Sequence, residues 1–472
     1  MSEPRKYYLG GTWESSAETV TIRNPFDDSA VEDCSLASAK DANTAVEKAG
    51  KGFGASRKLS SAERFEILSG ISESIRKERE LFASLMTSEV GKAISLSRGE
   101  VDRAVMTFRL AAEEAKRISG EVLPLDLHAS SAGRFGVVRR FPIGVVLAIS
   151  PFNYPLNLVA HKVGPAIASG NAWILKPPPQ APGTSLELAR IIEESGFPKE
   201  AFSVLPCRNE VAESLVTDDR INMLSFTGSA AVGWNLKSKA GKKKILLELG
   251  GNAGVIVDES ARIAEAARRN AMGAFVYSGQ VCIKVQRIFI HQNVFDRYVE
   301  AFLNETKRIV AGDPRKEETM VGPLIDEASA SRVLLWVEEA RKAGATLLNG
   351  GARSGRVIEP TVLLDADRTS RVYCEEVFGP VVTLHRFDTF ENAVRMINDS
   401  RFGLQAGVFS NDYRNILYAY QTIEAGAVVI NDNPTYRIDH MPYGGIKDSG
   451  FGREGLKYAI EAMTEPKLLV AA

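Results

Sequence analysis

The sequence has few cysteine and histidine residues, and they do not cluster. Four cysteines (Cys34, Cys207, Cys282 and Cys374) and five histidines are scattered over 472 residues, with no C-x-x-C pair. This scarcity argues against a disulfide framework and against a zinc site, and it is typical of proteins from a reducing cytoplasm. We therefore expect a cytoplasmic protein without a bound metal.

The sequence also lacks an excess of charge of one sign and any long hydrophobic run. Its formal net charge is −1, whereas nucleic acids and anionic membranes attract strongly basic proteins. The longest apolar runs, such as Val145–Ile149, are too short to cross a bilayer, and the N-terminal residues M-S-E-P-R-K-Y-Y-L-G-G have no apolar signal-peptide core. With 44% hydrophobic and 25% charged residues, the composition is that of a soluble globular protein. We expect a small-molecule partner, no nucleic acid and no membrane.

What the sequence does contain is an alternation of buried strands and helices of about ten residues. The strands predicted in the first half are Val145–Ile149, Ala172–Lys176, Phe202–Leu205, Met223–Phe226 and Lys244–Leu249. A second alternating run begins near Gly251, with strands predicted at Val285–His291, Val381–Phe387, Gly407–Ser410 and Ala427–Asn431. This pattern predicts an α/β protein with two doubly wound sheets and right-handed crossovers.

The remaining segments are organised differently. Residues 5–30 predict short strands, and residues 41–119 have helical periodicity, clearest at Ala62–Lys77 and Val101–Ile118. Residues 121–140 predict a loop with a short strand pair, and the final residues predict a short apolar strand that can extend a neighbouring subunit's sheet.

Cys282 lies in the stretch Tyr277–Arg287, Y-S-G-Q-V-C-I-K-V-Q-R, between a small-residue turn and a β-branched run. A lone cysteine in an apolar setting is most often a small buried hydrophobic residue. A turn containing Gly279, however, would hold the thiol where a substrate can reach it and where backbone N–H groups lower its pKa. The stretch alone leaves both interpretations open.

Two further polar residues stand at predicted strand ends. Glu248, in L-E-L-G-G, is either a satisfied strand-end carboxylate or a general base whose pKa is raised by partial burial. Asn153, in P-F-N-Y-P, either caps a turn or donates its amide to a developing oxyanion. The motifs S-P-F-N, K-P-P-P and F-T-G-S all follow predicted strands, where ligands bind in such sheets, although no G-x-G-x-x-G fingerprint follows any of these strands.

Taken together, L-E-L-G-G, G-Q-V-C, P-F-N-Y-P, F-T-G-S and E-E-V-F-G-P closely resemble the aldehyde dehydrogenase superfamily. The resemblance continues to M-P-Y-G-G-I-K-D-S-G-F-G-R-E-G near the end of the chain, and it is closest to the non-acylating lactaldehyde/glyceraldehyde-type branch. It implies a Rossmann-like cofactor domain (1–120, 141–249 and 441–462) and a catalytic domain (250–440). It also implies a small oligomerisation β arm (121–140 and 463–472) and a homodimer or homotetramer.

The resemblance assigns a mechanism to three residues. The Cys282 thiolate attacks an aldehyde, while the Asn153 amide and the Cys282 backbone N–H hold the oxyanion. The thiohemiacetal loses hydride to NAD or NADP, and Glu248 activates the water that hydrolyses the thioester to a carboxylic acid. Lys162 matches a family lysine that is sometimes assigned to proton relay.

The same resemblance implies the residues that contact the cofactor. Lys176 binds the adenosine ribose, Glu376 binds the nicotinamide ribose, and the helix that begins after Gly228 and Ser229 faces the pyrophosphate. The aromatic rings of Phe152 and Phe378 lie near the nicotinamide, and Ser150 belongs to the same set.

Two departures from the family pattern concern the coenzyme. Pro179 stands where many NAD-preferring members carry a glutamate, and the loop C-R-N places Arg208 where a glycine-containing loop is usual. Arg208 is either an exposed loop residue or a ligand of the NADP 2′-phosphate, so the preference between NAD and NADP stays open.

For the substrate, the resemblance indicates Arg109, Tyr154 and Arg437, which match residues that hold the anion of phosphorylated three-carbon aldehydes. A third arginine of that set is Val281 here. Two arginines and a tyrosine can still hold a carboxylate, sulfonate, phosphonate or phosphate. We therefore expect a short hydroxy- or anionic aldehyde.

Three alternatives remain. Coenzyme A can replace water as the thioester acceptor, although acylating relatives commonly lack the glutamate that Glu248 matches. A non-catalytic structural member of the fold has no physical need for Cys282, Glu248 and Asn153 together. A cysteine hydrolase needs a histidine partner, and no motif places one beside Cys282.

Overall fold

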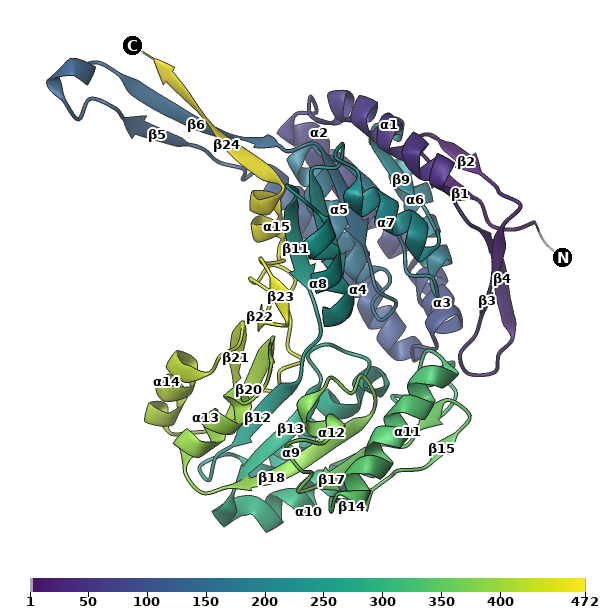
Figure 1. Cartoon of the computed structure of the whole chain (residues 1–472), viewed down its shortest axis with the longest axis vertical. Coiled ribbons are helices and arrows are strands. Elements are labelled where there is room, and N and C mark those ends of the chain that lie inside the picture. The colour runs from purple at the N-terminus through teal and green to yellow at the C-terminus, as the bar shows by residue number, and fades with distance from the viewer. Residues whose placement is uncertain (1–2, 472) are drawn as a thin grey trace.

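The structure, a computed structural model, describes residues 3–471. It consists of two α/β lobes and a slender β arm that projects from the N-terminal lobe (Figure 1). Within residues 3–471, no helix is both long and apolar enough to cross a membrane.

The N-terminal lobe is built on an eight-stranded sheet with five central parallel strands. The order is β2-β1-β9-β8-β7-β10-β11-β23, and β1, β2 and β23 pair antiparallel at its edges. The strands are β1 (Tyr7–Leu9), β2 (Thr12–Glu14), β7 (Val145–Ile149), β8 (Ala172–Lys176), β9 (Phe202–Val204), β10 (Met223–Thr227), β11 (Lys244–Glu248) and β23 (Gly450–Phe451). Chain order reverses between β7 and β10, which makes the carboxyl ends of these strands the expected ligand site.

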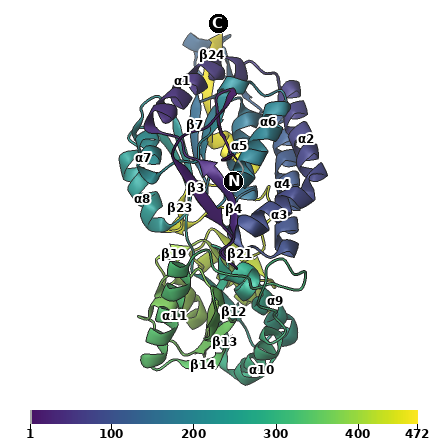
Figure 2. The same cartoon turned by 90° about the vertical axis from the view of Figure 1, so that its right-hand side faces the viewer.

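Helices cover both faces of this sheet. In Figure 2, α7 and α8 lie on one side and α2, α3 and α4 on the other. The helices are α1 (Ala39–Ser56), α2 (Ser61–Lys77), α3 (Arg79–Val90), α4 (Ile94–Ala115), α5 (Asn157–Ser169), α6 (Pro182–Glu194), α7 (Asn209–Thr217), α8 (Ala230–Lys239) and α15 (Leu456–Ala462). Capping boxes begin α1 and α2: Ser38 pairs with Asp41, and Ser60 with Glu63.

The second lobe contains a seven-stranded sheet in the order β14-β17-β18-β13-β12-β20-β21, in which only β14 is antiparallel. Its strands are β12 (Ala253–Val257), β13 (Val285–His291), β14 (Thr346–Asn349), β17 (Thr361–Leu364), β18 (Val381–Phe387), β20 (Gln405–Phe409) and β21 (Ala427–Ile430). Its helices are α9 (Ile263–Phe275), α10 (Phe295–Thr306), α11 (Glu327–Lys342), α12 (Arg371–Cys374), α13 (Phe390–Asn398) and α14 (Tyr413–Thr422). Strands β12 and β13 are buried along their whole length, which explains their apolar sequences.

The arm is a three-stranded antiparallel sheet of β5 (Glu121–Pro124), β6 (Phe135–Pro142) and the C-terminal β24 (Thr464–Ala471), in the order β24-β6-β5. Leu468, Leu469 and Val470 are exposed along β24. The remaining strands of residues 3–471 form three two-stranded sheets. They are β3 (Thr19–Arg23) with β4 (Ala30–Ser35), β15 (Arg353–Ser354) with β16 (Val357–Ile358), and β19 (Phe402–Gly403) with β22 (Ile446–Lys447).

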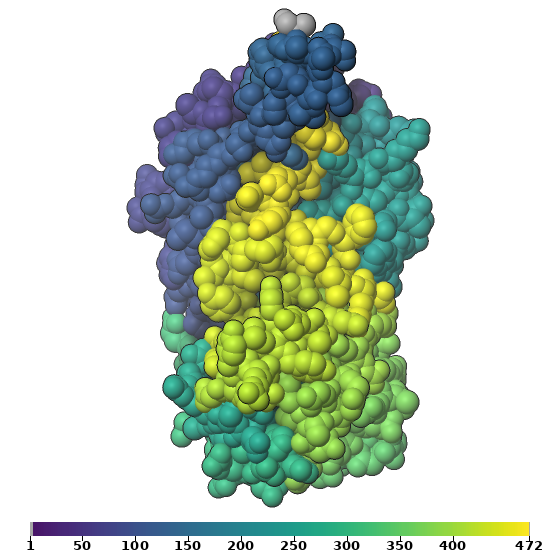
Figure 3. Space-filling view, turned by 90° about the vertical axis from the view of Figure 1, so that its left-hand side faces the viewer, coloured from purple at the N-terminus to yellow at the C-terminus, as the bar shows by residue number. Residues whose placement is uncertain are grey.

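The predicted two α/β sheets are confirmed, and β7, β8, β13 and β18 have the predicted bounds. The sequence prediction missed β12, the first strand of the second sheet, and the short strands between α11 and β18. After β21 the chain returns to the first lobe and then enters the arm. Figure 3 shows this last part of the chain, in yellow, as a continuous band from the second lobe to the arm.

Candidate active site

A cavity of about 410 Å³ is lined by residues of both lobes. The first lobe contributes residues that follow β7, β10 and β11, including Asn153, Gly228 and Glu248. The second lobe contributes Cys282 and Glu376, among others. The carboxyl edge of the first sheet therefore faces the turn that carries the cysteine.

Cys282 follows a turn with an unusual backbone. Tyr277, Ser278 and Gly279 have φ angles of 50°, 55° and 67°, three consecutive residues in the left-handed region. At Gly279 a Cβ atom would lie 2.2 Å from the carbonyl oxygen of Gly379, so a larger residue does not fit there. This turn holds Cys282 partly exposed at the cavity wall instead of in the core.

The Cys282 Sγ atom lies 3.1 Å from the hydroxyl oxygen of Tyr443. Burial raises the pKa of the thiol to about 11, and the nearby Glu376 and Glu248 carboxylates also raise it. The Tyr443 hydroxyl and the Arg437 guanidinium act in the opposite direction. The pKa of this thiol is therefore raised, and not lowered as the turn predicted, because burial outweighs the groups that stabilise the thiolate.

Asn153 is buried in the loop after β7. Its Nδ2 donates to the carbonyl oxygen of Gln280, at 3.0 Å, which joins this loop directly to the cysteine turn. Its Oδ1 has no hydrogen-bond partner within residues 3–471. An amide has two N–H groups, so one donor remains available to a ligand in the cavity.

Glu248 ends β11 and is 2% exposed, and neither carboxylate oxygen has a hydrogen-bond partner among the described residues. Burial raises its pKa well above the ordinary value, and repulsion from Glu454 adds to this effect. The cations of Arg437 and Lys162 oppose it. A buried carboxylate without partners is costly, and groups of this kind are concentrated at functional sites.

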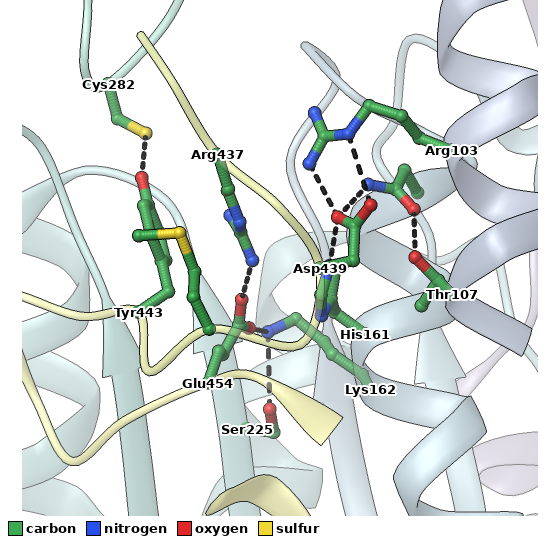
Figure 4. A network of polar contacts seen from close by, with 12 residues as sticks. Arg103, Thr107, His161, Lys162, Ser225, Cys282, Arg437, Asp439, Tyr443 and Glu454 are labelled. Carbon is green, nitrogen blue, oxygen red and sulfur yellow. Dashed lines mark hydrogen bonds and ion pairs between the residues drawn. The ribbon is translucent and has the colours of Figure 1, made fainter. Parts of the chain in front are cut away.

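The groups that act on the pKa of Glu248 belong to a buried charge network, which Figure 4 shows. The Glu454 carboxylate accepts from Lys162 Nζ at 3.0 Å and from Arg437 Nη2 at 3.1 Å. Although burial alone would raise it, these cations hold the pKa of Glu454 at about 2, so this carboxylate is charged. Lys162 also donates to the Ser225 hydroxyl, at 3.2 Å.

The other side of the cavity contains the residues predicted to bind a nucleotide. Gly228 and Ser229 precede α8, and the Ser229 side chain does not cap this helix, which leaves N–H donors at its N-terminus. At Gly228 a Cβ atom would lie 2.6 Å from the Phe226 ring. The rings of Phe152 and Phe378 meet edge to face with centroids 6.0 Å apart, and both line the cavity.

Glu376 also lines the cavity and accepts from the backbone N–H of Gly251, at 3.0 Å. Burial raises its pKa to about 7, against the hydrogen bond from Gly251 and the Lys284 cation. Its carboxylate is therefore shared between the charged and neutral forms near neutral pH.

Three predicted cofactor residues lie outside the cavity lining. Lys176 ends β8, and burial lowers the pKa of its ammonium group. Ser150 is buried beside it, and the Ser150 N–H donates to the Lys176 carbonyl. Arg208 is exposed and forms an ion pair with Glu18, a residue that the sequence did not indicate.

The structure does not bring the three predicted substrate residues together. Arg437 lines the cavity, and Tyr154 packs in the same cluster as Cys282. Arg109, however, is exposed on α4 and lines a separate hollow between α2 and α4. Its prediction as a residue of this site is wrong, because α4 turns that position away from the cavity.

Arg103, not Arg109, is the α4 arginine near Tyr154. Its guanidinium carbon lies 5.8 Å from the Tyr154 ring centroid, and its Nη2 lies 2.6 Å from an Asp439 carboxylate oxygen. That Asp439 oxygen is also 2.9 Å from Nε2 of His161 (Figure 4). Both the burial of His161 and the nearby Arg437 lower the pKa of His161, so its ring is neutral.

The sequence profile of the aldehyde dehydrogenase family matches residues 13–469, nearly the whole chain. The chain belongs to the aldehyde dehydrogenase family. It is therefore an enzyme of that family, with the two α/β lobes of the aldehyde dehydrogenase fold.

Two named relatives show where this aldehyde dehydrogenase stands within the family. It is 42% identical to a 3-sulfolactaldehyde dehydrogenase of Priestia megaterium, over 100% of this chain and 99% of the relative. It is 38% identical to a lactaldehyde dehydrogenase of Methanococcus vannielii, over 98% and 99% of the two chains.

Solved structures of the family are equally similar to this aldehyde dehydrogenase. Aldehyde dehydrogenase 21 of Physcomitrella patens, solved with the reaction product succinate, has a TM-score of 0.97 and 40% identity and covers 100% and 99% of the two chains. The glyceraldehyde-3-phosphate dehydrogenase GapN of Methanocaldococcus jannaschii, solved with NADP, has a TM-score of 0.93 and 37% identity over 97% and 100%.

Several residues of this aldehyde dehydrogenase site were missed by sequence reasoning. Tyr443 and Glu454 lie within the C-terminal motif that supported the resemblance. The motif drew attention to this segment, but it did not indicate the contact of Tyr443 with Cys282 or of Glu454 with Lys162. Arg103 and Arg109 lie on different faces of α4, and the helical periodicity of the sequence could have shown which of the two faces the core. Nothing in the sequence indicated that Glu18 reaches Arg208.

Proposed function

We propose that this aldehyde dehydrogenase oxidises a short hydroxy- or anionic aldehyde to its carboxylic acid with NAD⁺ or NADP⁺, through a thioester on Cys282. The observation that carries the proposal is the single cavity that Cys282, Glu248 and Asn153 line together with Gly228 and Glu376. A nucleophile, a base and an oxyanion donor around one cavity are what aldehyde oxidation by covalent catalysis needs.

The residues present fit a nicotinamide dinucleotide. The N-terminus of α8 offers uncapped N–H donors to a pyrophosphate, and Glu376 offers a carboxylate to ribose hydroxyls. The buried Lys176 ammonium makes no ion pair within the described part of the chain, which suits a hydroxyl ligand. When bound, the cofactor supplies the hydride acceptor of the reaction.

Cys282 begins the reaction by giving up its proton. Arg437 and Tyr443 favour the thiolate, which attacks the carbonyl carbon and forms a C–S bond. The carbonyl oxygen becomes an oxyanion, and the Asn153 amide and the Cys282 backbone N–H donate to it. Loss of hydride from the same carbon leaves a thioester on Cys282.

Glu248 completes the reaction as general base. Its charged form takes a proton from water, whose oxygen attacks the thioester carbon, and the C–S bond then breaks to release the acid and the thiolate. The raised pKa of Glu248 makes it a stronger base than an exposed glutamate. The cations of Arg437 and Lys162, both held by Glu454, oppose the rise in this pKa and so favour the charged, proton-accepting form of Glu248.

An anionic or hydroxylated substrate is supported by Arg437 and by the named relatives. Arg437 is 7% exposed in its side chain, its Nε has no partner within residues 3–471, and it lines the cavity. One guanidinium edge is therefore free to bind a substrate oxygen. The relatives named for 3-sulfolactaldehyde and lactaldehyde act on three-carbon aldehydes that carry such groups.

Coenzyme choice depends on Arg208. The guanidinium can bind a 2′-phosphate, and no carboxylate at Pro179 opposes it, but the Glu18 carboxylate competes for the same cation. We infer use of both NADP⁺ and NAD⁺. An Arg208→Ala variant that kept the ratio of NADP⁺ to NAD⁺ efficiency would contradict this inference.

Assembly and location complete the proposal. We propose a homodimer or homotetramer formed through the arm of β5, β6 and β24, whose β24 edge is apolar and exposed. The scattered free cysteines remain the basis for proposing a cytoplasmic, metal-independent enzyme.

The test is a panel of lactaldehyde, 3-sulfolactaldehyde, succinic semialdehyde and propanal, each with NAD⁺ and with NADP⁺. Reduced nicotinamide is followed by absorbance. We expect turnover that is faster for hydroxylated or anionic aldehydes than for propanal. Cys282→Ala should lower kcat by roughly 10⁴-fold or more, as loss of a nucleophile does elsewhere.

Cys374→Ala serves as the matched control, because Cys374 is a partly exposed free cysteine outside the cavity. It should retain wild-type turnover. If turnover requires coenzyme A, the second half-reaction is acyl transfer to coenzyme A and not hydrolysis. No turnover with any pair would exclude the proposed activity.

A further inference from the structure

A buried ion pair lies directly behind the loop that carries Asn153. Lys92 follows α3 and Glu100 lies on α4, and their side chains are 1% and 0% exposed. Lys92 Nζ lies 2.5 Å from Glu100 Oε2. Burying both charges is costly, and neither residue lines the cavity, so contact with a substrate does not explain them.

The contacts of this ion pair lead to the backbone around Asn153. Lys92 Nζ donates to the carbonyl oxygen of Asn153, at 3.0 Å. Glu100 Oε1 accepts from the backbone N–H groups of Leu156 and Asn157, at 2.9 and 3.0 Å. The two side chains therefore hold both ends of the segment 153–157.

Glu100 also replaces a missing helix cap. Helix α5 begins at Asn157, and the residue before it, Leu156, offers no side-chain acceptor for the free N–H groups of the first turn. Glu100 supplies that acceptor from α4. Without it, the first turn of α5 and the loop before it would lose the hydrogen bonds that fix their position.

Lys92 contacts the cysteine turn as well. Its Nζ lies 3.5 Å from the ring centroid of Tyr154 and 4.6 Å from that of Tyr277, within cation–π range of both. Tyr277 belongs to the strained turn before Cys282, and Tyr154 follows Asn153. One ammonium group thus connects the loop of the amide to the turn of the thiol.

We propose that Lys92 and Glu100 are positioning residues that fix the Asn153 amide relative to Cys282 through the backbone of residues 153–157. The inference rests on the proposed function, in which that amide donates to the oxyanion. Because a displacement of about 1 Å can cost roughly a hundredfold in rate, loss of this support should act on the chemistry and not on cofactor binding.

The decisive experiment is a double-mutant cycle of Lys92→Met and Asn153→Ala. The readout is kcat/KM for lactaldehyde and for 3-sulfolactaldehyde at saturating cofactor. We expect Asn153→Ala to lower kcat/KM about 10²- to 10³-fold, the usual cost of one oxyanion donor. Lys92→Met should lower it roughly 10- to 100-fold, with the KM for the cofactor within about twofold of the wild type.

The double variant separates the possible outcomes. If Lys92 acts through Asn153, adding Lys92→Met to Asn153→Ala should cost no more than about threefold. A loss in the double variant equal to the product of the single losses would overturn the positioning role. An Asn153→Ala variant with unchanged kcat/KM would instead contradict the oxyanion role in the proposed function.

A second pair of variants keeps the test valid if Lys92→Met does not fold. Glu100→Gln removes one charge at constant shape, and Glu89→Gln is its matched control. Glu89 is equally buried and accepts from the backbone N–H groups of Gly183 and Thr184 at the N-terminus of α6, at 2.7 and 3.1 Å.

Both glutamine variants should lower the unfolding temperature, but only Glu100→Gln should lower kcat/KM, by about tenfold. Equal kcat/KM values in the two variants would overturn the proposal, because stability alone would then account for the ion pair. Circular dichroism before each assay establishes that the compared proteins are folded.

Discussion

The two lobes are built alike, yet they place their site residues in different ways. In the first lobe, Asn153, Gly228 and Glu248 stand at or directly after the carboxyl ends of parallel strands. In the second lobe, Cys282 and Glu376 stand on irregular segments before β13 and after α12, away from the carboxyl ends of that sheet.

The backbone angles give the physical reason for this difference. Within residues 3–471, seven non-glycine residues have positive φ, and three of them, Tyr277, Ser278 and Phe378, adjoin the cavity groups of the second lobe. Strain of this kind persists only where the surrounding packing enforces it. The first lobe thus follows the general rule for ligand sites in α/β sheets, whereas the second depends on strained turns.

The largest expected effect comes from the first lobe. Glu248→Gln should slow hydrolysis of the thioester about 10²- to 10⁴-fold, because the general base is lost while the thiol is intact. Rapid mixing should then show a burst of one reduced nicotinamide per site, followed by slow turnover. Normal turnover would remove Glu248 from the reaction and leave Asn153 as the only one of these catalytic groups in the first lobe. Slow turnover without a burst would place the role of Glu248 before hydride transfer and contradict its role in hydrolysis.

An intermediate effect should distinguish Arg437 from Arg109. Arg437→Met should lower kcat/KM for 3-sulfolactaldehyde roughly 10- to 100-fold more than for propanal, because a charge-assisted hydrogen bond to the anion is lost. Arg109→Met, on the outer face of α4, is the matched control and should change neither value. Equal losses for the charged and neutral aldehydes would mean that Arg437 acts on the thiol alone.

The smallest expected effect is a shift in thiol reactivity with pH. Burial raises the Cys282 pKa to about 11, so the rate of alkylation by iodoacetamide should rise with pH and level off only above that value. Arg437 lowers this pKa, so Arg437→Met should move the profile to higher pH. The profile is read in the cofactor-free enzyme by mass spectrometry of the Cys282 peptide, and a shift to lower pH would contradict the assigned electrostatics.

Much of the fold followed from the sequence for identifiable reasons. Strands β7, β8, β13 and β18 are apolar runs bounded by turn residues, so their limits were visible, and the carboxyl-end rule placed Asn153 and Glu248 near one another. Strand β12 was missed because Ala253–Val257 follows two glycines and an asparagine that resemble a loop.

The contacts within the site were harder to predict. The pairing of Cys282 with Tyr443 joins residues far apart in sequence, and the charge of Glu454 depends on Lys162 and Arg437, which come from other segments. The error at Arg109 has the same origin, because about one and two-thirds helical turns separate it from Arg103, which is partly buried while Arg109 is exposed. Motifs identify such groups, but only packing decides their charge and direction.

The late return of the chain to the first lobe has a consequence for biosynthesis. Arg437, Tyr443 and Glu454, which set the charge around the thiol, are synthesised long after Cys282. At ordinary translation rates the delay is roughly ten to thirty seconds. During that interval the nascent protein carries Cys282 without Arg437 and Tyr443, the two groups that favour its thiolate in the folded enzyme, so a chain that ends before these residues would lack this stabilisation.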